Sequence, residues 1–151
     1  MPSFRKRGIV ISVLAALSVL AASCGESKVS QCNKLIEVAN KAVSDVQAIT
    51  ASANPQDVNA MTQIAETADQ AKASMEALEV SDESLQTFKQ RFVAMYADTS
   101  KATRDLVTAV NANNSQGAEA AYTALQTATD QETPLVNEVN TYCGGTPQTT
   151  P

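Results

Sequence analysis

The segment Leu85–Ala109, with the sequence LQTFKQRFVAMYADTSKATRDLVTA, decides the fold of this chain. Its apolar and small side chains return every three or four residues, with neither Gly nor Pro between them, at Leu85, Phe88, Phe92, Met95, Thr99, Ala102, Leu106 and Ala109. This spacing predicts a long amphipathic helix with one buried stripe. A stripe of this kind is stable only when other elements cover it, so the remaining segments must supply the cover.

Three further segments show the same alternation, one before Ser52, one after Pro55 and one after Ser115. Their stripes read Cys32, Leu35, Ala39, Ala42, Val46, Ile49 and Ala53 in the first; Met61, Ile64, Ala68, Ala71, Met75 and Leu78 in the second; and Ala118, Ala121, Leu125, Ala128, Glu132, Leu135, Val139 and Tyr142 in the last. No strand-type alternation appears. The chain is therefore predicted to be all-α, an up-down-up-down antiparallel four-helix bundle.

Turn and cap residues separate the four segments. The expected N-caps are Asn54, which precedes Pro55, then Ser81, and then Asn114 or Ser115, and Gly144 with Gly145 should end the last helix. Pro134 falls inside the fourth segment, where it removes a backbone donor and clashes one turn back. The fourth helix should therefore kink near Asp130 or begin again around Thr133.

The N-terminal segment has the features of an export signal. Arg5, Lys6 and Arg7 precede an apolar run from Gly8 to Ala22, which is shorter than the ~20 residues that a membrane-spanning helix needs. Leu20-Ala21-Ala22-Ser23-Cys24 follows directly and resembles the lipobox of bacterial lipoproteins, although the favoured Leu three places before the cysteine is Ala21 here. The resemblance implies that acyl chains such as palmitate are attached to Cys24 and anchor the protein to a membrane.

These features divide the chain into four parts. We expect a lipoprotein signal peptide over residues 1–23, a lipidated linker over 24–29, the four-helix bundle over 30–144 and a disordered tail over 145–151. The alternative is an ordinary secretory signal, cleaved near Ala22 or Ser23, with an incidental cysteine. Either signal places the folded part outside the cytoplasm, on the periplasmic or lumenal face or at the cell surface.

The remaining cysteines, Cys32 and Cys143, lie near the two ends of the folded region. In an antiparallel bundle with an even number of helices these ends meet, and an exported protein can keep a disulfide, so we predict a Cys32–Cys143 bridge. Two free thiols with a redox function are the alternative, but no C-x-x-C motif is present.

Charge and composition exclude several classes of function. The loss of Arg5, Lys6 and Arg7 with the signal leaves 8 basic and 16 acidic residues, a net charge of −8. Nucleic acids and anionic lipid surfaces are therefore not expected ligands, because both bind clustered Lys and Arg. The chain has no histidine and no Gly-rich phosphate loop, so we predict a non-enzyme without a metal or cofactor.

Three groups of residues are candidate sites. Glu132 occupies a core position of the fourth stripe, where an unpaired carboxylate is costly, unless Pro134 turns it towards solvent. Phe88, Phe92 and Tyr96 recur every four residues and either line a ligand pocket or fill the core. Glu66, Asp69, Glu76 and Glu79 form an acidic surface that either binds a protein partner or is simply solvated.

The sequence therefore supports two functions. The first is a membrane-tethered, non-catalytic interaction or scaffold module whose acidic surface meets a protein partner. In architecture such a module is similar to the small lipidated four-helix accessory and assembly factors of photosystem II in cyanobacteria, with which it shares no sequence motif. The second is a carrier of a small apolar ligand in the bundle core, beside Phe88, Phe92 and Tyr96.

Overall fold

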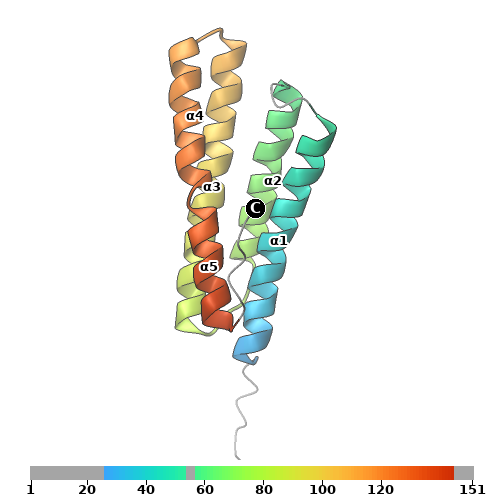
Figure 1. The fold of residues 1–151 in the computed structure, drawn as a ribbon, viewed down its shortest axis with the longest axis vertical. Helices are drawn as coiled ribbons and strands as arrows, with labels where there is room; N and C mark the ends of the chain where they lie inside the picture. The colour runs from blue at the N-terminus through green and yellow to red at the C-terminus, as the bar shows by residue number, and fades with distance from the viewer. Residues whose placement is uncertain (1–25, 54–56, 145–151) are drawn as a thin grey trace, which may run out of the picture.

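The computed structural model describes residues 26–53 and 57–144, and these residues form five helices and no strand. The helices are α1 (Lys28–Ser52), α2 (Val58–Glu76), α3 (Glu83–Asn111), α4 (Ser115–Thr129) and α5 (Glu132–Cys143). Together, α4 and α5 form the predicted fourth helix, and we call them the fourth arm. The prediction of an all-α four-helix bundle is confirmed (Figure 1).

The two ends of the described chain meet at one end of the bundle. The first turns of α1 and the last turn of α5 lie at the bottom of Figure 1, as the even number of arms requires. Cys32 and Cys143 form a disulfide there, with 5.9 Å between their Cα atoms. We call this part of the bundle the disulfide half, and the opposite part, which ends at the α1–α2 and α3–α4 connections, the open half.

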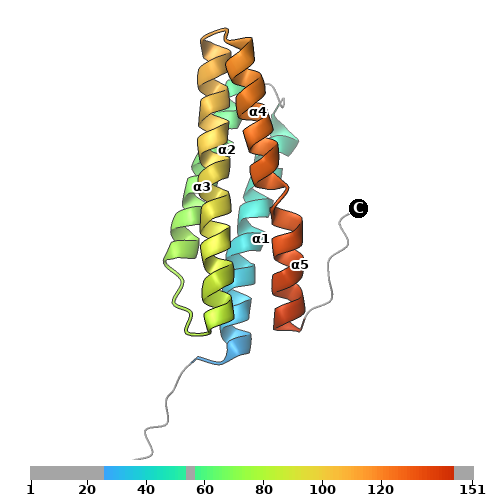
Figure 2. The ribbon, with the colours of Figure 1, turned by 90° about the vertical axis from the view of Figure 1, so that its left-hand side faces the viewer.

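The fourth arm breaks where the sequence predicted a kink. The α4 helix ends at Thr129, and α5 begins at Glu132 and continues below it with a sideways offset (Figure 2). Pro134 is the third residue of α5, where a backbone N–H has no partner within its own helix. The new helix start thus removes the clash and the lost hydrogen bond that Pro134 would cause inside a continuous helix.

Large apolar side chains concentrate in the disulfide half. Leu135 and Val139 of α5 are almost completely buried, and they belong to one cluster with Leu35, Phe92 and Met75. The offset of α5 brings these two residues into that core. The disulfide half therefore holds most of the apolar area that stabilises the fold.

The open half has small side chains at its helix contacts. The buried residues of α4 are Ala121 and Ala128, and Gly117 approaches α3 so closely that a Cβ atom there would lie 3.3 Å from the Cβ of Ala109. These small residues let α4 pack tightly against α3. Little bulk remains to fill the space between this pair and α1.

Three helices begin at residues other than those expected. The α1 helix starts at Lys28, two residues before Ser30, because Ser27 accepts a hydrogen bond from the Ser30 amide. Asp57 caps α2, whereas the predicted cap Asn54, and Pro55 after it, lie outside the described residues. Asp82, not Ser81, caps α3 through the Leu85 amide at 3.0 Å. Asn114 caps α4 and Gly144, with a φ of 82°, ends α5, as predicted.

Gln31 explains why Ser81 is not the cap of α3. Its side chain is buried, and its Oε1 accepts hydrogen bonds from the backbone amides of Ser81 at 2.7 Å and Asp82 at 3.2 Å. Its Nε2 donates to the Ser81 hydroxyl and to the Glu26 carbonyl. The α2–α3 connection is thus fastened to the first turn of α1, and Ser81 is held outside the helix.

The end of α5 is fastened to the same place. The Tyr142 hydroxyl donates to the Asp82 carboxylate, with oxygen distances of 2.9 and 2.8 Å, and the ring of Phe88 packs edge-on against Tyr142 at 5.7 Å. The disulfide, Gln31 and Tyr142 therefore close one end of the bundle. Away from this end, the exposed Asp69–Arg104 ion pair links α2 to α3.

Within the described part of the chain, no helix is long and apolar enough to cross a membrane. Cys24, the export signal and the tail over residues 145–151 lie outside the described residues.

Candidate functional site

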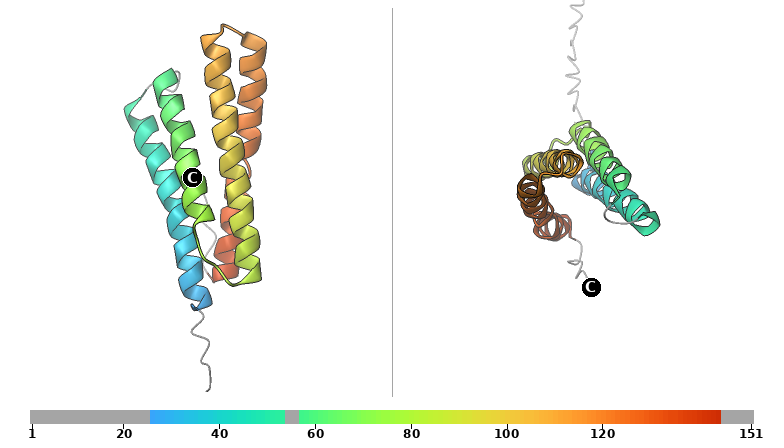
Figure 3. Two further views of the ribbon diagram at one scale, coloured as in Figure 1. Left: turned by 180° about the vertical axis from the view of Figure 1, so that it is seen from behind. Right: turned by 90° about the horizontal axis from the view of Figure 1, so that it is seen from above.

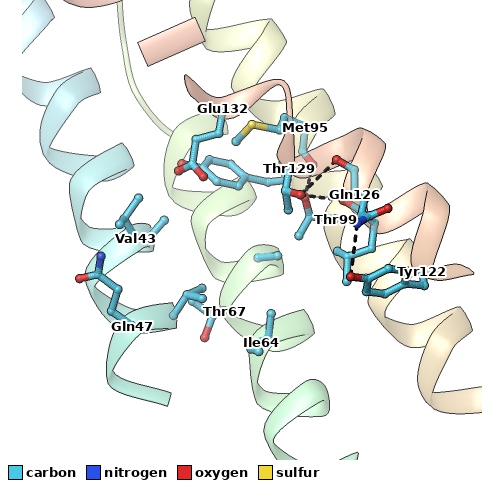
Figure 4. Close-up of a pocket in the computed structure, with 15 residues that line it drawn as sticks. Val43, Gln47, Ile64, Thr67, Met95, Thr99, Tyr122, Gln126, Thr129 and Glu132 are labelled. Atoms are coloured by element: carbon cyan, nitrogen blue, oxygen red, sulfur yellow. Dashed lines mark hydrogen bonds between the residues drawn. The ribbon is translucent and has the colours of Figure 1, made fainter. Parts of the chain in front are cut away.

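An apolar cleft lies between the two hairpins of the bundle and encloses about 390 Å³. Every arm contributes to its walls (Figure 4). The lining includes Val43 and Val46 of α1, Ile64 and Ala68 of α2, Met95 and Tyr96 of α3, Tyr122 and Leu125 of α4, and Glu132 at the start of α5. This volume suits one small molecule, since ligand pockets commonly enclose 300–1,000 Å³.

The cleft exists because α4 packs against α3 and leaves its second side uncovered. In the views of Figures 1 and 3, α1 and α4 lie apart in the open half, whereas α2 stays packed against α3. Most residues that line the cleft from α1 and α2 are short or branched, such as Val43, Thr67 and Ala68. Val46, Ile64 and Leu125, which were expected in the core, are consequently only partly buried.

Glu132 stands at the end of the cleft that is nearer the disulfide half (Figure 4). Of the two interpretations drawn from the sequence, neither is complete: the new helix start leaves the residue partly exposed, but its side chain still lines the apolar wall. Burial raises the pKa of the Glu132 carboxyl. No lysine or arginine lines the cleft, and Glu132 forms no ion pair within residues 26–53 and 57–144.

Tyr96 adds a buried phenol hydroxyl to the same cleft. Its side chain is only 5% exposed, and its hydroxyl has no hydrogen-bond partner among the described residues. Burial raises the pKa of Tyr96, and the negative charge of Glu132 raises it further, which places the two groups within each other's electrostatic reach. A buried tyrosine hydroxyl normally has a hydrogen-bond partner, so the Tyr96 hydroxyl lacks an interaction that a ligand in the cleft could supply.

The aromatic series on α3 divides between the core and the cleft. Phe92 is buried in the disulfide half, Phe88 packs against Tyr142, and only Tyr96 lines the cleft. The three residues span more than two helical turns, so the first two lie beside α5 and only the last reaches the level where the hairpins separate. The ligand pocket is thus displaced from the position that the sequence indicated.

The acidic surface carries less free charge than its sequence suggests. Glu66, Asp69, Glu76 and Glu79 are all exposed. However, Asp69 pairs with Arg104 of α3 at 2.6 Å, and Glu76 pairs with Lys72 at 2.9 Å. Hydrogen bonds from Ser100 and Arg104 lower the pKa of Asp69. Docking of a protein partner on this surface stays a prediction, and the cleft is the better-defined site.

The raised pKa of Glu132 predicts how Glu132→Gln changes stability with pH. The folded state holds this proton to a higher pH than the unfolded state, so the free energy of unfolding falls as pH rises from the ordinary glutamate pKa of ~4.3 to the folded value. Above the folded-state pKa, Glu132 is ionised in both states, and the full cost of burying its charge lowers the free energy of unfolding. We therefore expect the variant to be more stable than the wild type at pH 7, with the difference vanishing near pH 4.

Urea unfolding at both pH values checks this expectation. Glu119→Gln is the matched control, because Glu119 is exposed on α4 and forms no ion pair in the described part of the chain. Its effect should be small at either pH. Equal effects of the two substitutions at pH 7 would show that Glu132 is not desolvated.

The described residues contain no group of three or more Cys, Asp or Glu side chains arranged to hold a metal ion. Their candidate chemistry is therefore that of the cleft: a mainly apolar wall with one carboxylate, the phenols of Tyr96 and Tyr122, and neutral threonine and glutamine side chains. Comparisons with protein families, with curated proteins and with solved structures found no match to this chain.

Proposed function

We propose that this chain is an extracytoplasmic lipoprotein, anchored to a bacterial membrane through Cys24, whose bundle binds a small and largely apolar ligand without chemical turnover. The observation that carries the binding function is the cleft of about 390 Å³, which all four arms line with mainly apolar side chains. A well-packed bundle of this size has few voids larger than a water molecule. An apolar cleft of this volume is therefore best explained as a ligand site.

The anchor is supported by the arithmetic of the cysteines. The disulfide uses Cys32 and Cys143 and leaves Cys24 as the one cysteine without a structural role. A disulfide also fits an exported protein, because oxidising compartments maintain such bonds. This proposal combines the ligand-carrier hypothesis with the membrane tether of the interaction-module hypothesis.

Binding of the neutral dye Nile red tests the ligand function. The purified protein should bind the dye saturably with one site per chain, and an organic extract of protein from its native source should contain a co-purified small molecule. Val46→Trp should abolish dye binding. Val46 lines the cleft and is only partly buried, so an indole ring at this position should fill part of the cleft.

Val110→Trp is the matched control, since Val110 is 40% exposed on α3 and does not line the cleft. It should leave dye binding unchanged. An empty extract together with the absence of saturable dye binding would overturn the proposal.

A further inference from the structure

Over residues 26–53 and 57–144, the lining of the cleft contains a negatively charged group and no positively charged one. Among the described residues that line the cleft, Glu132 is the only carboxylate, no basic residue accompanies it, and Tyr96 and Tyr122 are the only other titratable groups. A second, narrower groove between α1 and α5 also contains Glu132, and no basic residue lines that groove either. The described part of the chain thus supplies a partly buried negative charge without a counter-charge.

The hydroxyl of Tyr96 also lacks a partner among the described residues. A buried donor or acceptor without a partner costs about 1–3 kcal/mol relative to a satisfied one. Tyr96 is 5% exposed and lines the cleft, and the charge of Glu132 influences its hydroxyl. Both residues line the same cleft, so one ligand group bound at this end is the candidate partner of both.

The chemistry of the two side chains selects that group. An anionic head such as a fatty-acid carboxylate would be repelled by ionised Glu132, and no lysine or arginine would compensate it. A primary ammonium carries three N–H donors and a positive charge. It can donate to the Glu132 carboxylate and to the Tyr96 oxygen at the same time, and charge-assisted hydrogen bonds of this kind are the stronger ones.

We propose that the ligand of the cleft is a cationic amphiphile, a single small molecule with a hydrocarbon body and an amine head group. The head group pairs with Glu132 and Tyr96, and the body lies along Val43, Ile64 and Leu125. This inference rests on the ligand-binding function proposed above and adds to it the charge and the orientation of the ligand.

Calorimetric titration at pH 7 with three probes of equal chain length tests the inference: decylamine and decanoic acid below their micelle concentrations, and decanol below its solubility limit. The full chain is used in its Cys24→Ser form, so that no detergent is needed to replace the membrane. We expect one decylamine per chain, bound about ten-fold more tightly than decanol, with decanoic acid the weakest.

Substitutions separate the cleft from non-specific adsorption to an acidic protein. Glu132→Gln should reduce decylamine affinity about ten-fold and bring it to the level of decanol, and Tyr96→Phe should reduce it by a smaller factor. Glu119→Gln removes the same charge from the exposed surface of α4 and should leave the affinity unchanged.

The outcomes distinguish this inference from the function on which it rests. If decylamine and decanol bind equally, or if Glu132→Gln and Glu119→Gln act alike, the cationic head group is wrong while the apolar cleft remains a ligand site. If none of the three probes binds with a stoichiometry of one, both the inference and the ligand-binding function fail.

Discussion

Removal of the Cys32–Cys143 bridge, by the double substitution to Ala, should lower the free energy of unfolding by about 4–5 kcal/mol. The bridge joins positions 111 residues apart and so restricts almost the whole folded region in the unfolded state. A loss of this size is a large share of the ~5–15 kcal/mol that stabilises a typical domain. The share is large here because the open half of the bundle buries mainly alanine.

Urea unfolding of the oxidised protein, the reduced wild type and the double variant measures this effect. Reduction and substitution should agree closely, because both release the same constraint on the unfolded chain. Either single substitution already breaks the bridge, so it should cost nearly as much as the double substitution, a strongly non-additive result. A loss below about 1 kcal/mol in all variants would mean that the packing of α5 alone holds the two ends together.

Replacement of Cys24 by Ser should transfer nearly all of the protein from the membrane fraction to the soluble extracytoplasmic fraction. Two or more acyl chains give stable anchoring, whereas one chain binds only reversibly, and the substitution removes the sulfur that receives the lipid. None of the described helices is long and apolar enough to cross a bilayer. Cell fractionation with detection of the folded chain measures the redistribution.

Cys32→Ser provides the matched control for this experiment. It removes the sulfhydryl of a neighbouring cysteine and breaks the disulfide, so it destabilises the bundle, but the surviving protein should stay with the membrane. Unchanged membrane association of the Cys24→Ser protein would contradict the lipoprotein interpretation and favour an ordinary secretory signal.

The start of α1 determines where a lipid at Cys24 would hold the bundle. Only four residue steps separate Cys24 from Lys28, a reach of about 14 Å when fully extended. The disulfide half would therefore ride next to the membrane, and the open half would point away from it. An anchored bundle of this orientation presents its cleft at a distance from the lipid headgroups.

Much of the fold can be read from the spacing of apolar side chains. The three-four alternation predicted each of the four arms, Pro134 predicted the break in the fourth arm, and the cysteine positions predicted the disulfide. These features depend on residues within one turn of each other, or on the parity of an antiparallel bundle. Local sequence contains both kinds of information.

Helix starts were less predictable because remote residues decide them. Ser81 has a side chain well suited to capping α3, yet Gln31, fifty residues earlier, binds it and its backbone amide. Asp82 then takes the capping position. No local pattern signals this exchange, because Gln31 resembles any other polar residue of an amphipathic helix.

By itself, the sequence of this protein determined the helices, their order, the break before Pro134 and the pairing of Cys32 with Cys143. Only the tertiary structure decided that the bundle is closed at one end and hollow towards the other, and that Glu132 and Tyr96 share the hollow. The physical reason is that a helix stripe records which side is apolar but not how far apart two helices pack. That distance depends on the combined side-chain volumes of four arms. Here α4 packs closely against α3, and the small residues of α1 and α2 leave the space beside it unfilled.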